Sequence, residues 1–97
     1  MPIIVVLELR FKPESVSAGH DVMGRALRDT RAFQGNLDTE VLIDTEDEAH
    51  WLIYEKWDTV EDDEAYRAFR AGEGRLSELP PLLAAPPVKT RYTISDT

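Results

Sequence analysis

The chain has 97 residues, 42% hydrophobic and 31% charged, a composition typical of one small globular domain that we expect to span residues 1–97. Its formal net charge of −8 argues against nucleic acid and anionic membranes as partners, because both bind basic surfaces. The absence of cysteine excludes disulfides, thiol catalysis, zinc–thiolate sites and iron–sulfur clusters.

Histidine is scarce in the chain, and no multi-histidine metal site is expected. His20 and His50 are the two histidines of the sequence, too few for such a site within one chain.

The apolar run from Ile3 to Leu7 is too short for the core of a signal peptide, and no stretch approaches the ~20 apolar residues of a membrane helix. We therefore expect a cytoplasmic protein without membrane contact.

The first two predicted elements are a strand and a helix. Residues Ile3 to Phe11 predict a strand, because apolar side chains recur at every second position. Pro13 ends it, since proline cannot donate to a strand ladder. Ser15 or Ser17 is the expected cap of a helix that runs to about Arg31. The apolar stripe of this helix comprises Val16, His20, Met23, Ala26, Leu27 and Thr30.

The middle of the chain predicts a hairpin. Leu37 to Asp44 and His50 to Trp57 alternate as two strands joined by a short acidic turn, so they pair antiparallel. Gly35 precedes them as a candidate left-handed residue. The second strand carries Trp51, Ile53, Glu55 and Trp57 on one face, and His50, Leu52, Tyr54 and Lys56 on the other. We expect Trp51 in the core and His50 exposed beside the acidic turn.

Thr59 resembles the N-cap of a second helix, Val60 to Ala71, with an acid three residues later. The residues expected to face inward are Val60, Ala65, Tyr66 and Phe69. The acidic residues 61–64 are expected to be solvated, as suits a helix start. A short helical turn from Arg75 to Leu79, a proline-containing linker over residues 84–87, and a last strand from Val88 to Ser95 complete the chain.

The element order β-α-β-β-α-β predicts an α+β, ferredoxin-like fold with two helices on one face of a four-stranded antiparallel sheet. The other face of the sheet has no cover from the chain itself. Its expected apolar residues are Ile4, Val6, Leu42, Leu52 and Tyr54. Because exposing such a patch is unfavourable, we predict a homodimer through sheet-to-sheet packing, in which two sheets close a shared barrel and each protomer keeps a cavity between helices and sheet.

With these features the chain resembles the antibiotic biosynthesis monooxygenase family over nearly its whole length. The resemblance is carried by the opening run Ile4 to Leu7, by Gly35, by Glu55-Lys56-Trp57 and by Ala65-Tyr66-Arg67. It implies a dimeric α/β barrel that oxidises a small aromatic molecule, anthrone- or quinol-like, without a cofactor. The alternative is a non-catalytic dimeric ligand-binding or accessory protein of the same fold.

The resemblance also indicates candidate site residues. Trp57 and Tyr66 match the tryptophan and tyrosine of the anthrone-oxidising branch, whereas Ile53 stands where that branch has asparagine, and its arginine falls near Glu73 to Arg75. The haem-degrading branch has a first-strand asparagine and a second-helix histidine. Leu7 and Tyr66 occupy those places, so haem degradation is disfavoured.

Several of these residues allow both a functional and a structural interpretation. Trp57 either stacks on a flat substrate or closes the core at the strand end. Tyr66 either donates a hydrogen bond or proton to a substrate oxygen or lies at the rim of an amphipathic helix. Ile53, Met23 and Phe69 are the further residues expected to line the substrate cavity.

Two titratable residues complete the candidate set. Glu55 is either a buried general base or the partner of an arginine. The candidate arginine partners of Glu55 are Arg25, Arg67 and Arg91. His20, on the apolar stripe of the first helix, is either a general base facing the cavity or a simply hydrogen-bonded residue.

Overall fold

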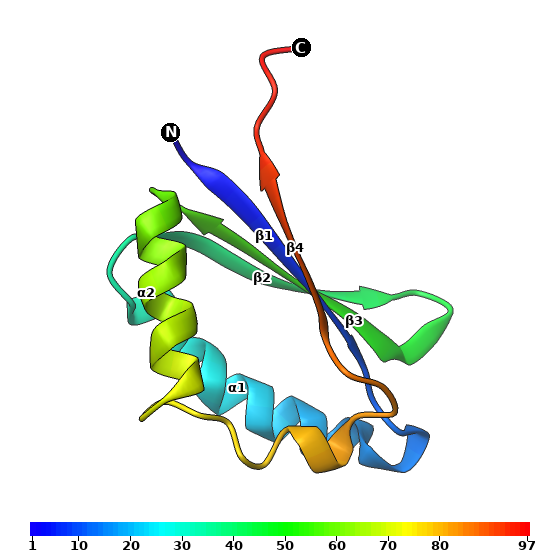
Figure 1. Ribbon diagram of the computed structural model, residues 1–97. Coiled ribbons are helices and arrows are strands. Elements are labelled where there is room, and N and C mark those ends of the chain that lie inside the picture. The colour runs from blue at the N-terminus through cyan, green and yellow to red at the C-terminus, as the bar shows by residue number, and fades with distance from the viewer.

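The computed structural model describes residues 1–97, and Figure 1 shows both long helices on one side of a twisted sheet. The elements are β1 (Ile3–Arg10), α1 (Val16–Ala32), β2 (Asn36–Asp44), β3 (Asp47–Trp57), α2 (Val60–Ala71) and β4 (Val88–Thr93). Two short 3₁₀ turns, Pro13–Ser15 and Pro80–Leu82, precede α1 and β4. The predicted α+β, ferredoxin-like arrangement is confirmed. No helix combines the length and the apolar character needed to cross a membrane.

The sheet has the strand order β2-β3-β1-β4, and all neighbours are antiparallel. β3 is the longest strand and lies inside the sheet, between β2 and β1. Ile53 is its central inward residue, paired with Val41 on one side and Leu7 on the other. The alternation of β1 and β3 places their fully buried side chains under the helices.

The core between sheet and helices has two parts, each built around a tryptophan. Trp51 packs with Leu9, Phe11 and Met23 at one end of α1, as expected for a core residue. The second cluster contains Ile3, Val5, Trp57 and Tyr66 under α2. The aromatic stretch of β3 therefore supplies the anchor of both halves of the core.

Both helix faces differ in part from the predicted ones. In α1, His20 is exposed, and the buried stripe runs instead through Gly19 and Val22. In α2, Ala65 is exposed, whereas Asp63 is fully buried, so the expectation that this acid is solvated is wrong. The reason in α2 is that charged side chains pair with basic groups from neighbouring elements, which pattern alone does not reveal.

Two boundaries near the C-terminus also differ. The expected helical turn over Arg75 to Leu79 is replaced by a 3₁₀ turn at Pro80–Leu82. Proline suits the first position of such a turn because its φ is preset and its missing N–H would have no partner there. The last strand ends at Thr93 rather than Ser95.

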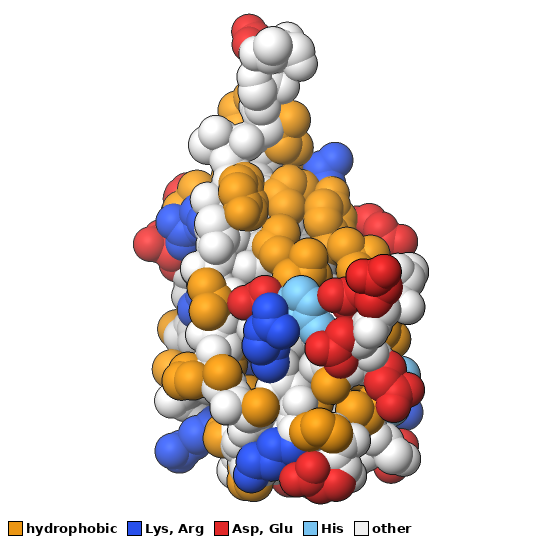
Figure 2. Space-filling view, turned by 90° about the vertical axis from the view of Figure 1, so that its right-hand side faces the viewer, with side chains coloured by type: hydrophobic (Ala, Val, Ile, Leu, Met, Phe, Trp, Pro, Cys, Tyr) orange, Lys and Arg blue, Asp and Glu red, His pale blue; other side chains and the backbone are white.

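The outer face of the sheet is apolar and uncovered. Leu42, Val88 and Tyr92 are 48%, 55% and 50% exposed, and the register places Leu42 beside Leu52, Val6 beside Tyr54, and Ile4 beside Tyr92. Figure 2 shows this face, with apolar side chains gathered over the strands and acidic groups around a histidine. The predicted apolar patch is thus present.

His50 lies at the edge of that patch and is more enclosed than expected. Its Nδ1 lies 3.0 Å from Oδ2 of Asp44 and its Nε2 lies 2.8 Å from Oε2 of Glu8. The hydrogen bonds to Asp44 and then Glu8 favour the charged imidazolium and raise the pKa of His50 above its ordinary value. The same contact lowers the pKa of Asp44.

Candidate functional site

A cavity of about 230 Å³ lies between the inner face of the sheet and the two helices. Its apolar wall includes Leu7, Met23, Leu27, Ile53, Leu76 and Leu79. Its polar wall consists of Thr30, Glu55, Tyr66, Arg67, Arg70 and Arg75. A concave, mostly apolar hollow with a few convergent polar groups is the usual form of a small-molecule site.

Tyr66 is the centre of the polar wall. Its hydroxyl lies 2.6 Å from Oγ1 of Thr30 on α1 and accepts a hydrogen bond of 2.7 Å from Nε of Arg70, one turn further along α2. Arg70 in turn donates to the carbonyl oxygens of Ala26 (2.8 Å) and Gly74 (2.9 Å). The arginine therefore fixes the tyrosine hydroxyl and ties α2 to α1.

The proton between Tyr66 and Thr30 has two possible positions. Oγ1 of Thr30 also lies 3.3 Å from the carbonyl oxygen of Ala26. When Thr30 donates to that carbonyl, Tyr66 donates to Thr30. When Thr30 turns its proton to Tyr66, the phenolic O–H becomes free. When the hydroxyls of Thr30 and Tyr66 both rotate in this way, Tyr66 is free to donate a hydrogen bond to a ligand.

Glu55 is 2% exposed and forms an ion pair with Arg67. Its Oε1 accepts from the Arg67 guanidinium and from Nε1 of Trp57 at 3.0 Å, so Arg67 is the arginine partner of Glu55 among the three considered. Arg25 pairs with Glu78 instead. No protein donor reaches Oε2 of Glu55, which leaves this oxygen available at the cavity wall.

Asp63 extends the Glu55–Arg67 pair behind the cavity. It accepts from Nε of Arg67 at 2.9 Å, and its other oxygen accepts from Lys89 at 3.1 Å and Arg91 at 2.9 Å on β4. Burial opposes ionisation of this carboxyl, but the hydrogen bonds from Arg91 and Lys89 and the charge of Arg67 outweigh it and hold its pKa below the ordinary value. This charged network fixes α2 against the sheet and orients Arg67.

The structure brings together four of the predicted site residues: Met23, Ile53, Glu55 and Tyr66 all line the cavity. Three others do not. Trp57 is fully buried and reaches the site only through its hydrogen bond to Glu55 and its contact with Tyr66, 5.0 Å between ring centroids. Phe69 packs beside Phe33, 5.5 Å between centroids, outside the cavity.

His20 is also outside this cavity, so the expectation that it faces the site is not met. Its ring lies over Trp51, 4.7 Å between centroids, beside a separate hollow along α1. The physical reason is the phase of α1, which turns Gly19 rather than His20 toward the sheet because Phe11 occupies the space next to it.

Three residues of the site were not predicted from the sequence: Thr30 and Arg70 in the cavity wall, and Asp63, which supports Arg67. One signal was available: Asp63, Tyr66, Arg67 and Arg70 recur at the three- and four-residue spacing of one helix stripe. A charged stripe is ordinarily assigned to solvent, and here it is the inward face of α2.

Comparison with known proteins places the chain in a family. The sequence model described as antibiotic biosynthesis monooxygenase matches residues 2–75, whereas a search of functionally curated proteins gave no match. A conserved protein from Methanosarcina mazei superimposes with a TM-score of 0.86 at 18% identity, covering 95% of this chain and 91% of the other. A solved antibiotic biosynthesis monooxygenase gives 0.81 at 18% identity, with coverages of 96% and 98%.

A third similar structure is a variant of SnoaB, a cofactor-independent oxygenase from Streptomyces nogalater, with a TM-score of 0.84 at 11% identity. It covers 99% of this chain and 95% of its own. At these identities the structural similarities show the fold, and the family follows from the sequence model, which spans about three quarters of the chain. The chain belongs to the antibiotic biosynthesis monooxygenase family.

Proposed function

We propose that this protein is a cofactor-independent monooxygenase that oxidises a small aromatic, anthrone- or quinol-like molecule in the cavity between helices and sheet. The observation that carries the proposal is the hydroxyl of Tyr66, held by Thr30 and Arg70 at the wall of an otherwise largely apolar cavity. Family membership and the similarity to a cofactor-independent oxygenase support the reaction class.

The cavity offers the groups that such a reaction needs. Tyr66 donates a hydrogen bond to the substrate oxygen, and the unoccupied Oε2 of Glu55 accepts the proton that leaves carbon. The nearby positive charge of Arg70 stabilises the resulting enolate. The apolar wall reduces the contact of the enolate with water.

Electrons then pass from the enolate to O2. With an anthrone, one oxygen atom becomes the new carbonyl of an anthraquinone and the other leaves as water, so the substrate itself supplies all the electrons. Neither a metal nor an organic cofactor is needed to balance this step.

Oxygen uptake tests the proposal. Anthrone and substituted hydroquinones are incubated with the protein, and we expect uptake above the uncatalysed rate. Tyr66→Phe should lower kcat about a hundredfold, as loss of a positioned acid–base or oxyanion donor does. Tyr92→Phe, on the outer face of β4, is the matched control. An absence of turnover across the panel, or full activity in Tyr66→Phe, contradicts the proposal.

A non-catalytic ligand-binding or accessory role is the second candidate. Two observations favour it: Trp57 is excluded from the cavity, and Ile53 presents an apolar side chain where a polar one is expected for anthrone oxidation. This candidate predicts aromatic ligands that bind the cavity without any consumption of oxygen.

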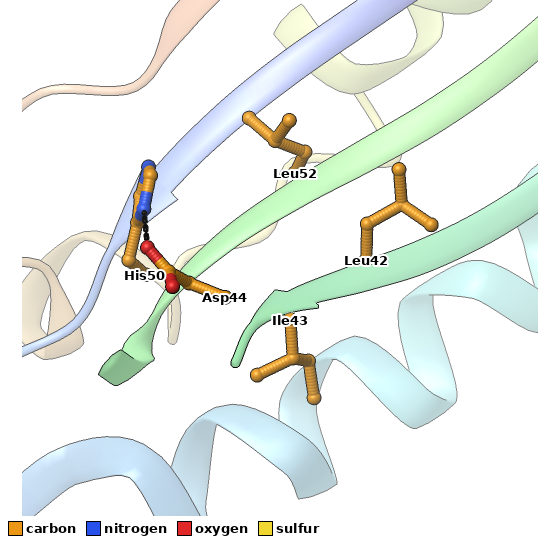
Figure 3. Close-up of a pocket in the computed structure, with 5 residues that line it drawn as sticks. All are labelled: Leu42, Ile43, Asp44, His50 and Leu52. Carbon is orange, nitrogen blue, oxygen red and sulfur yellow. Dashed lines mark hydrogen bonds and ion pairs between the residues drawn. The ribbon is translucent and has the colours of Figure 1, made fainter. Parts of the chain in front are cut away.

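We also propose that two copies pack through the outer face of the sheet. This face has a shallow hollow of about 200 Å³ at the β2–β3 hairpin. Figure 3 shows the side chains of Leu42, Leu52 and His50 on the outer side of the strands, whereas Ile43 points toward α1. A second copy would cover the exposed apolar side chains and remove their contact with water.

A further inference from the structure

The positive charges at the cavity exceed the negative ones. Three arginines, Arg67, Arg70 and Arg75, line it, and Glu55 is its one acidic residue. Arg67 is balanced, since it pairs with both Glu55 and Asp63. Arg70 and Arg75 form no ion pair with any carboxylate of the chain.

Arg70 is half-buried, and every hydrogen bond it donates goes to a neutral oxygen. The acceptors are the hydroxyl of Tyr66, the carbonyl oxygens of Ala26 and Gly74, and, more distantly, Oγ1 of Thr30. Charged groups withdrawn from water are normally paired. The chain contains 19 acidic residues and has a net charge of −8. The lack of a carboxylate partner for Arg70 is therefore specific to this cavity and does not reflect a shortage of acids.

Arg75 follows Gly74, whose carbonyl binds Arg70, and brings a second guanidinium to the same wall. It is exposed, and its guanidinium forms no hydrogen bond with the protein. It also borders a neighbouring hollow that contains two acids. Glu78 is already bound to Arg25 at 3.1 Å, and Asp29 forms no ion pair with Arg75. Arg75 is thus free to turn toward a ligand.

We propose that the ligand of this cavity is an aromatic acid. Its ring system lies against the apolar wall formed by residues such as Leu7, Ile53 and Leu76, and its carboxylate is the counter-charge of Arg70 and Arg75. A guanidinium and a carboxylate form strong, directional hydrogen bonds. The inference rests on the proposed function in one respect, namely that the cavity is the substrate site, and it names the substrate class.

Matched probes test this inference without chemistry. Binding of 2-naphthoate and of 2-naphthamide, which has nearly the same shape and no charge, is measured by isothermal titration calorimetry. We expect the acid to bind about tenfold more tightly or better, because hydrogen bonds to an ionised group are the stronger ones. Raising the salt concentration should weaken binding of the acid more than that of the amide.

Variants assign the preference to the two arginines. Arg75→Gln, which removes no hydrogen bond or ion pair within the protein, should reduce the acid-to-amide ratio several-fold. Arg70→Gln should bring it close to one, and Arg70→Lys should restore part of it. Arg28→Gln, an exposed arginine of α1 away from every hollow, is the control and should leave the ratio unchanged. If Arg70→Gln fails to fold, Arg75→Gln and the wild-type ratio still decide the question.

Equal affinity for acid and amide in the wild type overturns the inference, as does a preference that survives Arg75→Gln and Arg70→Gln intact. The binding of neither probe also overturns it, because the cavity then does not hold a two-ring ligand. Oxygen uptake reports separately on the proposed function. A protein that prefers the acid but consumes no oxygen supports the aromatic-acid ligand and refutes the proposed oxygenase activity. A protein that oxidises anthrone but shows no preference for the acid supports the oxygenase activity and refutes the aromatic-acid ligand.

Discussion

The carboxylate of Asp63 joins α2 to β4 and, through Arg67, to Glu55 on β3. Replacing it by asparagine leaves three basic side chains without their shared counter-charge. Because these partners are still partly exposed, we expect Asp63→Asn to destabilise the protein by about 2–3 kcal/mol, below the usual cost of breaking a fully buried pair. Urea unfolding measures this difference.

Glu64→Gln is the control, an exposed acid of the same helix without an ion pair, and should change the stability by less than about 0.5 kcal/mol. The effect of Asp63 depends on pH with a defined sign. Its pKa in the folded protein is lowered, so its stabilisation is present above its ordinary pKa and is lost as the pH falls through the folded value. The difference between wild type and Asp63→Asn should shrink below about pH 4. A difference that grows on acidification would refute this account.

At the scale of residues, the sequence predicts a cavity position for an apolar or aromatic side chain that falls on the inward face of its strand or helix. Tyr66 and Ile53 follow from periodicity, and the Glu55–Arg67 pair was among the expected alternatives. Arg70 and Asp63 were not predictable in the same way. Their inward orientation depends on partners that lie 44 and 28 residues away along the chain, Ala26 and Arg91.

At the scale of elements, the link between α1 and the hairpin depends on Gly35. This residue has a φ of 87°, and a Cβ there would overlap the side chain of Asp62 at the start of α2. We expect Gly35→Ala to destabilise the protein by at least about 1–3 kcal/mol, the cost of a strained backbone conformation. Thermal and urea unfolding provide the measurement.

Gly24 is the matched counterpart, because a Cβ at this position of α1 meets no atom within 4 Å. Gly24→Ala should stabilise the protein by about 0.5–1 kcal/mol through the higher helix propensity of alanine. Equal effects of the two substitutions would show that the local conformation at Gly35 carries no special constraint.

Element type and order were predictable because each segment has a strong local signal. Thr59 is one example: its hydroxyl accepts from the backbone N–H of Asp62 at 3.1 Å, as the capping pattern indicates. The face that α1 turns toward the sheet was harder to predict from the sequence. Whether His20 or Gly19 faces the sheet is decided by the position of Phe11, a tertiary contact that periodicity does not contain.

At the scale of the whole molecule, the outer face of the sheet predicts the assembly. Leu52→Glu places a charge in the middle of this face, beside Leu42. If two copies pack there, the substitution should weaken the dimer at least about thirtyfold, as loss of a central interface residue does. Light scattering after size-exclusion chromatography measures the mass. Ala65→Glu on the exposed side of α2 is the control, and a wild-type protein that is monomeric at all concentrations rules the dimer out.

In the proposed reaction, one oxygen atom of O2 enters an aromatic substrate in the cavity without a cofactor. Its most direct test is the oxidation of anthrone under isotopically labelled oxygen gas, with metal-free protein and mass spectrometry of the anthraquinone. We expect enzyme-dependent product that carries one labelled oxygen atom, and a rate about a hundredfold lower in Tyr66→Phe. Product without the label, or a rate equal to that of heat-denatured protein, would contradict it.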